Sequence, residues 1–262
     1  MLVAGSSFGA VASANDGPLT IVHCGDPQFG FSPDTTGEES YCRCRLAFER
    51  LVDAVNRLSP DLVCIAGDLT HDWHDVSRDW PRLLGAFRSP VLLTVGNHDL
   101  PDPASNEQRS QLEKTVGPIY KAMTVRGWRI ISLNSQFERL PNPDQAYVTW
   151  RDAEIVALSK SGMPGIVLTH HPLFLSNLHE PDTGENYPLK TRIALYDKLA
   201  EAGVRYILAG HTHRIMTNAY RGVPELMPET TCNNFDGRPF GFRVLKVWPS
   251  GDYEWSFVRV SA

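Results

Sequence analysis

Short apolar runs alternate with amphipathic stretches along this chain, and that order predicts a layered α/β domain. Runs rich in aliphatic and β-branched residues predict strands at 19–24, 62–66, 91–95, 128–135, 165–169 and 206–209. After the first run, apolar residues recur at three- and four-residue steps from Phe48 to Leu58. This spacing is typical of an amphipathic helix, which the following Ser-Pro pair is expected to end.

Local signals predict further helices along the chain. The segment 75–87 is expected to be helical, and Pro81 must either break or start that helix. The tetrapeptide at 142–145 offers an Asn as N-cap, then a first-position proline and a capping-box glutamine, which predicts a helix that runs to about Ser161. Another helix is expected at 191–202.

The last fifth of the chain is rich in strand signals. Strands predicted at 242–248 and 253–260 suggest a second sheet that packs against the first. The segment 172–189, by contrast, shows no clear periodicity and contains many loop-forming residues. Because it directly follows His170, we expect it to shape access to a site.

Polar side chains of the types that bind metals follow the predicted strands. They are Asp26 and Gln28, Asp68, Asn97 with His98 and Asp99, His170, and His211 with His213. Open α/β sheets bind their ligands at the carboxyl ends of the strands, so these side chains are expected to form one site. Carboxylate, imidazole and amide groups without a thiolate suit Mn, Fe, Mg or Zn, and the number of ligands suggests two ions rather than one.

Each of these motifs alone has a plainer explanation. A lone Gly67-Asp68 is more often a turn, and a histidine before a proline is a weak signal. The segments 96–99 and 210–213 are more specific, since alternate residues at a strand end point the same way. All of them occur in one chain, each after an apolar strand, and this combination favours a metal site over coincidence.

The order of these motifs resembles the calcineurin-like metallophosphoesterase family, from about Leu19 to Val258. Finer motifs at 26–30, 134–137 and 170–174 resemble its branch of calcineurin-like phosphoesterase domain-containing protein 1. The resemblance implies an α/β fold that is a four-layer α/β/β/α sandwich, with two mixed sheets flanked by helices. It also implies a single domain over 19–262.

The resemblance assigns a role to each ligand. Asp68 would bridge two ions. The other ligands would be Asp26, Gln28 and His213 for the first ion, and Asn97, His170 and His211 for the second. Most of the family has a histidine at position 28, so its glutamine here, which the branch shares, suggests weaker binding of the first ion or a preference for manganese or magnesium over zinc.

The remaining polar residues would act on the substrate or support the ligands. His98 would contact the phosphate or the leaving oxygen, and Asp99 would orient its imidazole. His171 lies one position after the family's ligand, so it is expected to pack beside the ligands rather than bind a metal. His71 either lines the substrate pocket or is an ordinary polar residue of a loop.

The predicted activity is hydrolysis of phosphate esters by a bridging hydroxide in a dinuclear site, with two divalent ions about 3.5–4 Å apart. A phosphomonoesterase similar to a protein serine/threonine phosphatase is expected first, acting on a phosphoprotein or a small phosphate ester. A phosphodiesterase or nucleotide pyrophosphatase is the alternative, because the same ions serve all these esters. The rival of another class is a non-catalytic scaffold, which would be expected to lose His98 or a bridging ligand.

The composition narrows the choice of partners. A net charge of −5 without any basic run argues against a track for nucleic-acid phosphates. No stretch approaches the ~20 apolar residues of a membrane span. Cys24 and Cys64 lie in predicted core strands, and a metal role for Cys42 and Cys44 is disfavoured because no second thiol pair accompanies them. Nothing in this cysteine pattern requires an oxidising compartment.

The first 18 residues form a leader with two interpretations. Its small, weakly apolar residues and its Ala-Ser-Ala triplet resemble the end of an export signal. It has no positive n-region, so a disordered leader is an equal alternative. The expected cellular location of the protein depends on the nature of this leader: an export signal would direct the protein to the periplasm, and without one it would be cytoplasmic.

Overall fold

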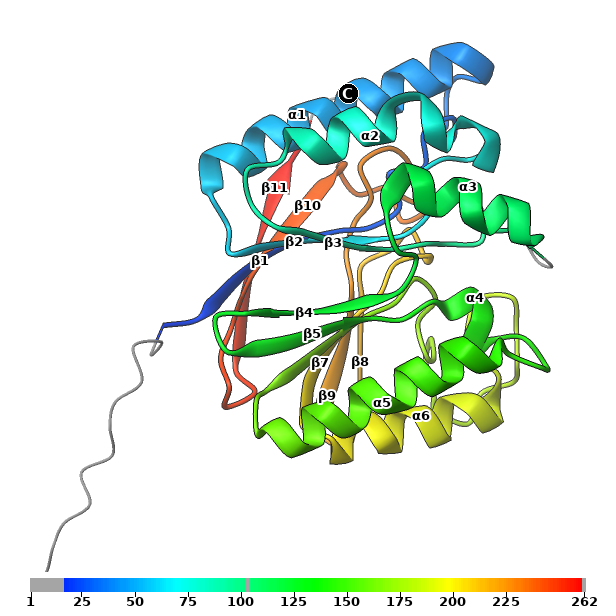
Figure 1. Cartoon of the computed structure of the whole chain (residues 1–262). Helices are drawn as coiled ribbons and strands as arrows, with labels where there is room; N and C mark the ends of the chain where they lie inside the picture. Colours follow the sequence, from blue (N-terminus) through cyan, green and yellow to red (C-terminus); the bar gives the residue numbers. More distant parts are fainter. Residues whose placement is uncertain (1–16, 102–103, 261–262) are drawn as a thin grey trace, which may run out of the picture.

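The structure is a computed structural model that describes residues 17–101 and 104–260. Residues 1–16 of the expected leader therefore lie outside the described residues. In the part of the chain that is described, no helix is both long and apolar enough to cross a membrane. The arrangement is the α/β/β/α sandwich that was expected (Figure 1).

The first sheet has the strand order β11-β10-β1-β2-β3. Its strands are β1 Leu19–Cys24, β2 Leu62–Ala66, β3 Val91–Thr94, β10 Gly241–Val247 and β11 Tyr253–Arg259. The pairs β1·β2 and β2·β3 are parallel, whereas β10 runs antiparallel to both β1 and β11. The carboxyl ends of β1, β2 and β3 therefore lie at the same edge of this sheet.

The second sheet has the order β4-β5-β6-β7-β9-β8. Its strands are β4 Lys121–Val125, β5 Trp128–Ser132, β6 Gly165–Leu168, β7 Val204–Leu208, β8 Met216–Tyr220 and β9 Val223–Met227. Strands β5, β6, β7 and β9 are parallel, and antiparallel partners close both edges.

Helices cover the outer face of each sheet (Figure 1). The first sheet is covered by α1 Gly37–Leu58, α2 Val76–Ala86 and α3 Asn106–Val116, with the 3-10 turn η1 Trp73–Asp75 before α2. The second sheet is covered by α5 Gln145–Ser161 and α6 Leu189–Glu201, and the short α4 Ser135–Glu138 follows β5. Alternation along β1 shows the layering, because Val22 packs under the helices while Ile21 packs between the sheets.

The C-terminal strands correct one expectation. Strands β10 and β11 do not build the second sheet; they extend the first one, with Leu19 opposite Val247 in the β1·β10 ladder. The second sheet forms instead from the middle of the chain, where β4, β8 and β9 were not expected. These strands are short and only partly alternating, so periodicity along the sequence gives them little signal.

Two helix boundaries also differ from expectation. Pro81 lies inside α2 rather than at a break, although a proline removes one helical hydrogen bond. Trp80 and Leu83 are buried against the first sheet, and this packing stabilises the helix across the proline. The N-cap of α5 is Asp144 rather than Asn142. The Asp144 carboxylate accepts hydrogen bonds from the backbone N–H groups of Ala146 and Tyr147 in the first turn of the helix.

Candidate metal centre

The carboxyl ends of strands from both sheets meet at one place. Here the His170 Nδ1, after β6 of the second sheet, lies 2.7 Å from the Ala66 carbonyl at the end of β2 in the first. Across the same boundary, the backbone N–H of His211 donates to both oxygens of Asp26 at 2.9 Å. These two contacts join the ends of β6 and β2 and the ends of β7 and β1 across the boundary between the sheets.

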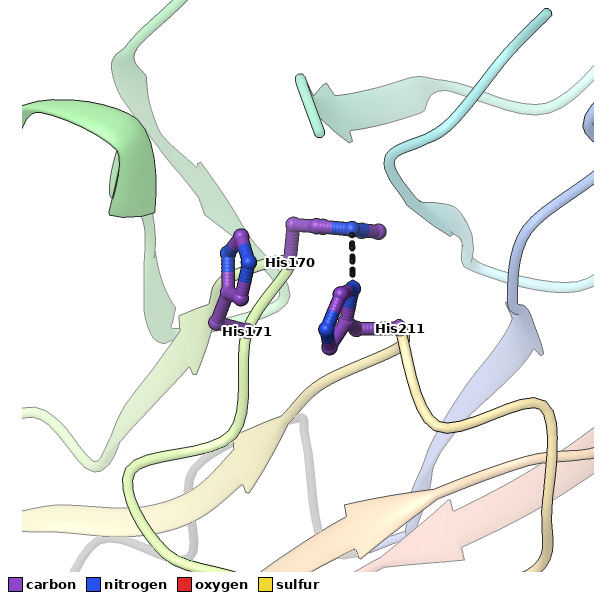
Figure 2. A group of neighbouring side chains, drawn as sticks. All are labelled: His170, His171 and His211. Carbon is purple, nitrogen blue, oxygen red and sulfur yellow. Dashed lines mark hydrogen bonds between the residues drawn. The ribbon is translucent and has the colours of Figure 1, made fainter. Parts of the chain in front are cut away.

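One group of predicted ligands consists of Asn97, His170 and His211. The His170 Nε2 lies 3.1 Å from the Asn97 Oδ1 and 3.1 Å from the His211 Nδ1. The Asp68 Oδ2 is 3.4 Å from the same His170 nitrogen. Figure 2 shows the His170 and His211 rings turned toward each other, with His171 beside them. Four donor atoms thus converge on one small volume.

A second group contains Asp26, Asp68 and His213, whose ligand atoms all lie within 4.8 Å of one another. The His213 Nε2 is 3.7 Å from the Asp26 Oδ1. The backbone N–H of Gln28 donates to the Asp68 carbonyl at 2.8 Å, and the buried Gln28 Oε1 accepts no hydrogen bond within the described protein. An unpartnered buried amide oxygen on a residue bonded to Asp68 fits a divalent cation.

Backbone carbonyls fix the rings of His213 and His170 on the side away from the cluster. The Asn233 carbonyl lies 2.6 Å from the His213 Nδ1, just as the Ala66 carbonyl holds the Nδ1 of His170. The Asp68 Oδ1 accepts the backbone N–H of His98 at 2.9 Å. Contacts of this kind select the tautomer that leaves the other nitrogen free for a metal, and they hold the ligand rings in place.

Unusual backbone conformations cluster here. Within the described residues, eight non-glycine residues have positive φ, and five of them are predicted ligands. They are Asp26, Gln28, Asp68, His211 and His213, with φ between 36° and 67°. This region is unfavourable for residues with a side chain, so the surrounding contacts must hold these residues in place, as is common at functional sites.

Buried charges explain the electrostatics of the cluster. Burial and the neighbouring Asp68 raise the pKa of Asp26 to about 8, although the charge of His170 lowers it. Burial and Asp68 likewise raise the pKa of Asp99 to about 7. Burial alone lowers the pKa of His170, but the carboxylates of Asp68 and Asp26 raise it to about 9. The carboxylates therefore favour a positive charge at the centre, which a divalent cation supplies.

His98 lies beside the ligands, but Asp99 does not orient it as expected. The His98 Nδ1 is 2.9 Å from the His71 carbonyl. The Asp99 carboxylate accepts N–H groups from Leu69 at 2.7 Å, Thr70 at 3.3 Å and Gly96 at 3.0 Å, and no hydrogen bond joins it to the His98 imidazole among the described residues. Asp99 thus fixes the loops around Asp68 and His98, because its buried oxygens are taken up by backbone donors.

His71 and His171 both border the centre. The His71 Nδ1 lies 3.4 Å from the Gln28 Nε2, and a cavity of about 310 Å³ opens beside the ring. One ring nitrogen of His171 lies within 4.8 Å of a ring nitrogen of His170 and of His211, close enough for the three to share a metal ion. Its Nδ1 is nevertheless 2.9 Å from the Ser135 hydroxyl and its Nε2 2.7 Å from Arg139, so both ring nitrogens already have partners. Packing beside the ligands remains the interpretation that these contacts favour.

The family model described as calcineurin-like phosphoesterase matches residues 19–214. This chain belongs to the calcineurin-like phosphoesterase family. It is therefore a metal-dependent hydrolase of phosphate esters, in a family that uses dinuclear metal centres.

Individual relatives show how far the similarity extends. A protein from Bos taurus named serine/threonine-protein phosphatase CPPED1 is 30% identical over 253 residues, which cover 88% of this chain and 80% of that protein. A probable cyclic nucleotide phosphodiesterase from Synechococcus is 30% identical over 207 residues, covering 74% of this chain and 75% of the relative. A solved dimetal phosphatase from Danio rerio has the same fold, with a TM-score of 0.62 and 14% identity, covering 94% of this chain and 100% of that one.

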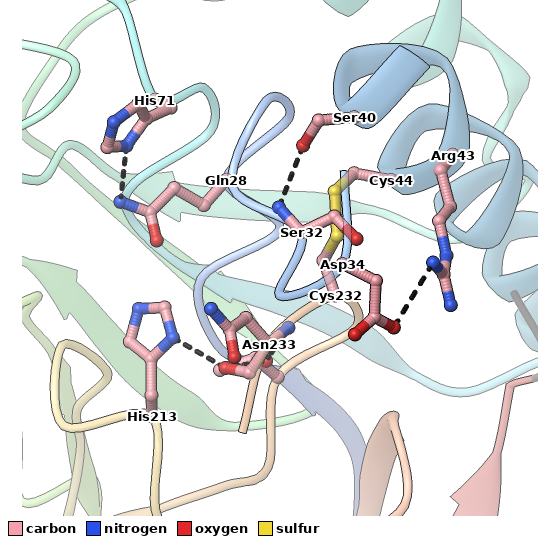
Figure 3. The surroundings of a disulfide bond; sticks show 11 residues. Gln28, Ser32, Asp34, Ser40, Arg43, Cys44, His71, His213, Cys232 and Asn233 are labelled. Atoms are coloured by element: carbon pink, nitrogen blue, oxygen red, sulfur yellow. Dashed lines mark hydrogen bonds and ion pairs between the residues drawn. A yellow bond between two sulfur atoms is a disulfide. The ribbon is translucent and has the colours of Figure 1, made fainter. Parts of the chain in front are cut away.

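A disulfide that no local sequence pattern predicted lies beside this phosphoesterase centre. Cys44 of α1 is bonded to Cys232, 188 residues away, with the Cα atoms 5.3 Å apart (Figure 3). Cys44 is therefore half of a crosslink and not an ordinary small core residue. Because Cys232 precedes Asn233, the crosslink fixes the loop whose carbonyl holds His213.

Other side chains at the centre also escaped sequence reasoning. The Glu185 Oε2 lies 3.0 Å from the His211 Nε2, and it comes from the 172–189 segment that was expected to shape access. The Phe235 ring stacks on His213 with 4.6 Å between ring centroids. A carboxylate in a long loop and a phenylalanine in a turn are too common to signal a site without their three-dimensional neighbours.

Proposed function

We propose that this phosphoesterase is a phosphomonoesterase that removes phosphate from phosphorylated serine or threonine or from small phosphate esters. The observation that carries the proposal is the position of Asp68. Its Oδ2 approaches His170 in one ligand group, while its carboxylate also belongs to the group of Asp26 and His213. A carboxylate shared by two ligand groups is the arrangement needed to hold two cations close together.

The donor set supports the assignment of ligands. Asp26, Gln28 and His213 would hold one cation with Asp68, and Asn97, His170 and His211 would hold the other. The set lacks thiolates and suits manganese as well as iron, magnesium or zinc. When bound, two such cations lower the pKa of a water molecule toward neutrality and neutralise the charge of the phosphate oxygens.

His98 would act on the leaving group. Its Nδ1 is held by the His71 carbonyl, and its side chain is partly exposed at the edge of the ligand groups. With its Nδ1 N–H donated to that carbonyl, the ring directs Nε2 away from it, and in the imidazolium form the Nε2 proton would pass to the ester oxygen that departs, which leaves a neutral imidazole. Proton donation to a leaving alkoxide typically contributes about 10²–10⁴ in rate.

The relatives support a monoester substrate over a diester. The relative named as a serine/threonine phosphatase aligns with 88% of this chain, and the one named as a probable cyclic nucleotide phosphodiesterase aligns with 74%. The scaffold alternative is not supported, because His98 and Asp68 are both present and the ligand atoms converge.

The test compares three substrates with Mn²⁺ added: p-nitrophenyl phosphate, a phosphoserine peptide and bis(p-nitrophenyl) phosphate. We expect turnover of both monoesters and at least tenfold lower kcat/KM for the diester. His98→Ala should lower kcat on the phosphoserine peptide by about 10²–10⁴. The control is His179→Ala, at an exposed histidine of the 172–189 segment, which should match the wild type. Preference for the diester would overturn the monoester assignment, and equal rates in wild type and His98→Ala would overturn the role of His98.

A further inference from the structure

Aromatic rings extend outward from His98 along one side of the centre. The His71 ring stacks on His98 with 4.7 Å between centroids and an interplanar angle of 27°. Phe31 in turn stacks on the His71 ring, with 4.9 Å between ring centroids and an interplanar angle of 8°. Phe235 meets the edge of Phe31 at 6.1 Å. Phe31, His71 and Phe235 are called the aromatic rim below.

The rim also borders the group of ligands that includes His213. Phe235 stacks on the His213 ring at 4.6 Å with an interplanar angle of 10°, and Phe31 approaches His213 edge-on at 5.8 Å. The rim therefore runs from His98 to His213. A substrate whose phosphate lies between these two histidines has this surface beside it.

Phe235 presents an unusual amount of apolar surface at this place. Its exposed fraction is 52%. The other large exposed hydrophobic side chains of the described residues lie on the outside of helices or on the edge strand β11, at Leu46, Leu58, Val156 and Trp255. Exposing a phenyl group to water is unfavourable in proportion to its apolar surface, so a partner that covers it gains affinity.

The turn that carries Phe235 is fixed rather than loose. The Phe235 N–H donates to the His213 carbonyl at 2.9 Å. Asn234 accepts the Thr230 N–H at 2.7 Å and donates to the Pro239 carbonyl at 3.0 Å. Together with the Cys232 crosslink, these bonds hold the ring in place before any substrate arrives. A preformed apolar surface binds at a lower entropic cost than one that must be ordered.

We infer that the aromatic rim binds a planar ring in the leaving group of the substrate, so that ring-bearing phosphate monoesters are preferred over otherwise similar esters without a ring. This inference rests on the proposed function and refines its substrate class. The leaving group departs on the side of His98, and the stacked row of His71 and Phe31 begins there. Flat unsaturated rings stack on aromatic side chains whatever their substituents, because each ring has a π face.

The test uses pairs of esters that differ by the ring. Adenosine 5′-monophosphate and ribose 5-phosphate both release phosphate from a primary alcohol, and only the first carries a nucleobase. A second pair, 2-phenylethyl phosphate and n-butyl phosphate, replaces the nucleobase with a phenyl ring. We expect kcat/KM to be about tenfold higher for the ring-bearing member of at least one pair. A preference in one pair alone identifies whether the ring is a nucleobase or a phenyl group.

Variants assign that preference to the rim. In Phe235→Ala and Phe31→Leu, the ratio of kcat/KM for the ring-bearing ester to that for its ring-free partner should fall toward one in the preferred pair. Trp255→Ala, at an exposed aromatic residue of β11, should keep the wild-type ratio of kcat/KM. Phe235→Leu serves as a second variant if alanine disturbs the turn, since leucine retains apolar bulk but has no π face. Equal kcat/KM within both pairs in the wild type, or an unchanged ratio in the Phe235 variants, would overturn the inference.

Direct binding separates this inference from the proposed function. Calorimetry with the manganese-loaded His98→Ala protein, in which hydrolysis is slow, measures the affinities for adenosine 5′-monophosphate and ribose 5-phosphate, and those for the phenylethyl pair. Absence of monoester hydrolysis together with ring-dependent binding would reject the proposed function and keep the rim. Hydrolysis of both members of each pair with equal affinities and equal rates would reject the rim and keep the function.

Discussion

The Nε2 of His170 and the Nδ1 of His211 lie 3.1 Å apart, although the two residues are separated by 41 positions and follow different strands. Asn97 adds its Oδ1 at 3.1 Å from the same His170 nitrogen. Nitrogen and oxygen atoms with free electron pairs are stable at such distances when a proton or a cation lies between them. This arrangement leads to the first prediction.

Removal of His170 should empty one of the two metal positions. We expect His170→Ala to lower the manganese content from two ions to one per chain, because Asn97, His211 and the shared Asp68 carboxylate offer too few donors. Elemental analysis after dialysis against trace Mn²⁺ measures this content. In His171→Gln both ions should remain, since the His171 nitrogens already contact Ser135 and Arg139. The opposite pattern, with an ion lost only from the His171 variant, would reassign the ligand.

Gly96 is expected to tolerate no side chain. A Cβ at this position would lie 2.1 Å from the Asp68 Oδ1 and 2.7 Å from the Asp68 backbone nitrogen. The carboxylate must move, and a displacement of about 1 Å at a reacting centre can reduce the rate by about 10². Gly96→Ala should therefore lower both metal affinity and kcat by at least this order.

The matched control for that substitution is Gly85→Ala in α2. Apart from the neighbouring helix backbone, no atom of the described residues lies within 4 Å of a Cβ there, so alanine should leave activity unchanged and raise helix stability by up to about 1 kcal/mol. Activity assays and thermal unfolding of the two variants give the comparison. Full activity in Gly96→Ala would show that the loop between β3 and His98 can adjust, contrary to this prediction.

Loss of the Cys44–Cys232 crosslink should affect both stability and the centre. Closing a loop of this length typically stabilises a protein by about 2–5 kcal/mol, so the double serine variant should unfold at lower urea concentration. It should also bind the His213-side ion more weakly, because Cys232 is adjacent to the Asn233 carbonyl that holds His213. Equilibrium unfolding and metal titration measure the two effects.

Cys42→Ser provides the control for the crosslink, since this free cysteine lies on the same helix and is partly exposed. Its stability and metal affinity should equal those of the wild type. If reduction with a dithiol leaves the unfolding curve of the wild type unchanged, the crosslink contributes nothing to stability and the prediction fails.

Glu225 should make the stability of the metal-free protein depend on pH. Burial raises the pKa of this carboxyl to about 8 from an ordinary value of 4.5, against the effect of the Leu173 N–H, which donates to it at 2.7 Å. Between these two pH values the folded protein binds more protons than the unfolded chain, so the free energy of unfolding falls as pH rises. The contribution of Glu225 is fully present below pH 4.5 and is lost as pH rises through about 8.

Glu225→Gln removes this proton linkage. Relative to the wild type, the variant should gain stability between pH 5 and pH 8, by at most about 1.4 kcal/mol for each pH unit. Urea unfolding in the presence of a chelator measures the difference, and Glu254→Gln, at an exposed residue of β11, should show no such trend. Parallel pH curves for wild type and Glu225→Gln would show that Glu225 remains ionised in the folded protein.

The parts of the fold and site that sequence reasoning found share one property: their signals are local. The apolar run of β1 and the three- and four-residue spacing around Phe48 specify a strand and a helix through neighbouring positions. The candidate ligands were predicted for the same reason, since Asp26, Asp68 and His170 each come just after such a run, and the structure brings these three side chains together. Weak local signals failed, as in β4 and β8, where partly exposed residues give no clear alternation.

The order of residues along the chain is enough to place carboxylates, amides and imidazoles at the strand ends, and their chemistry restricts the site to hard or borderline metal ions. Which groups meet is set by the folded chain: β10 pairs with β1, Cys44 pairs with Cys232, and Asp99 binds backbone N–H groups rather than His98. The two kinds of information differ in the sequence separation over which they act. Hydrophobic periodicity reflects positions a few residues apart, whereas these pairings depend on the packing of two sheets whose contacts join residues far apart in the chain.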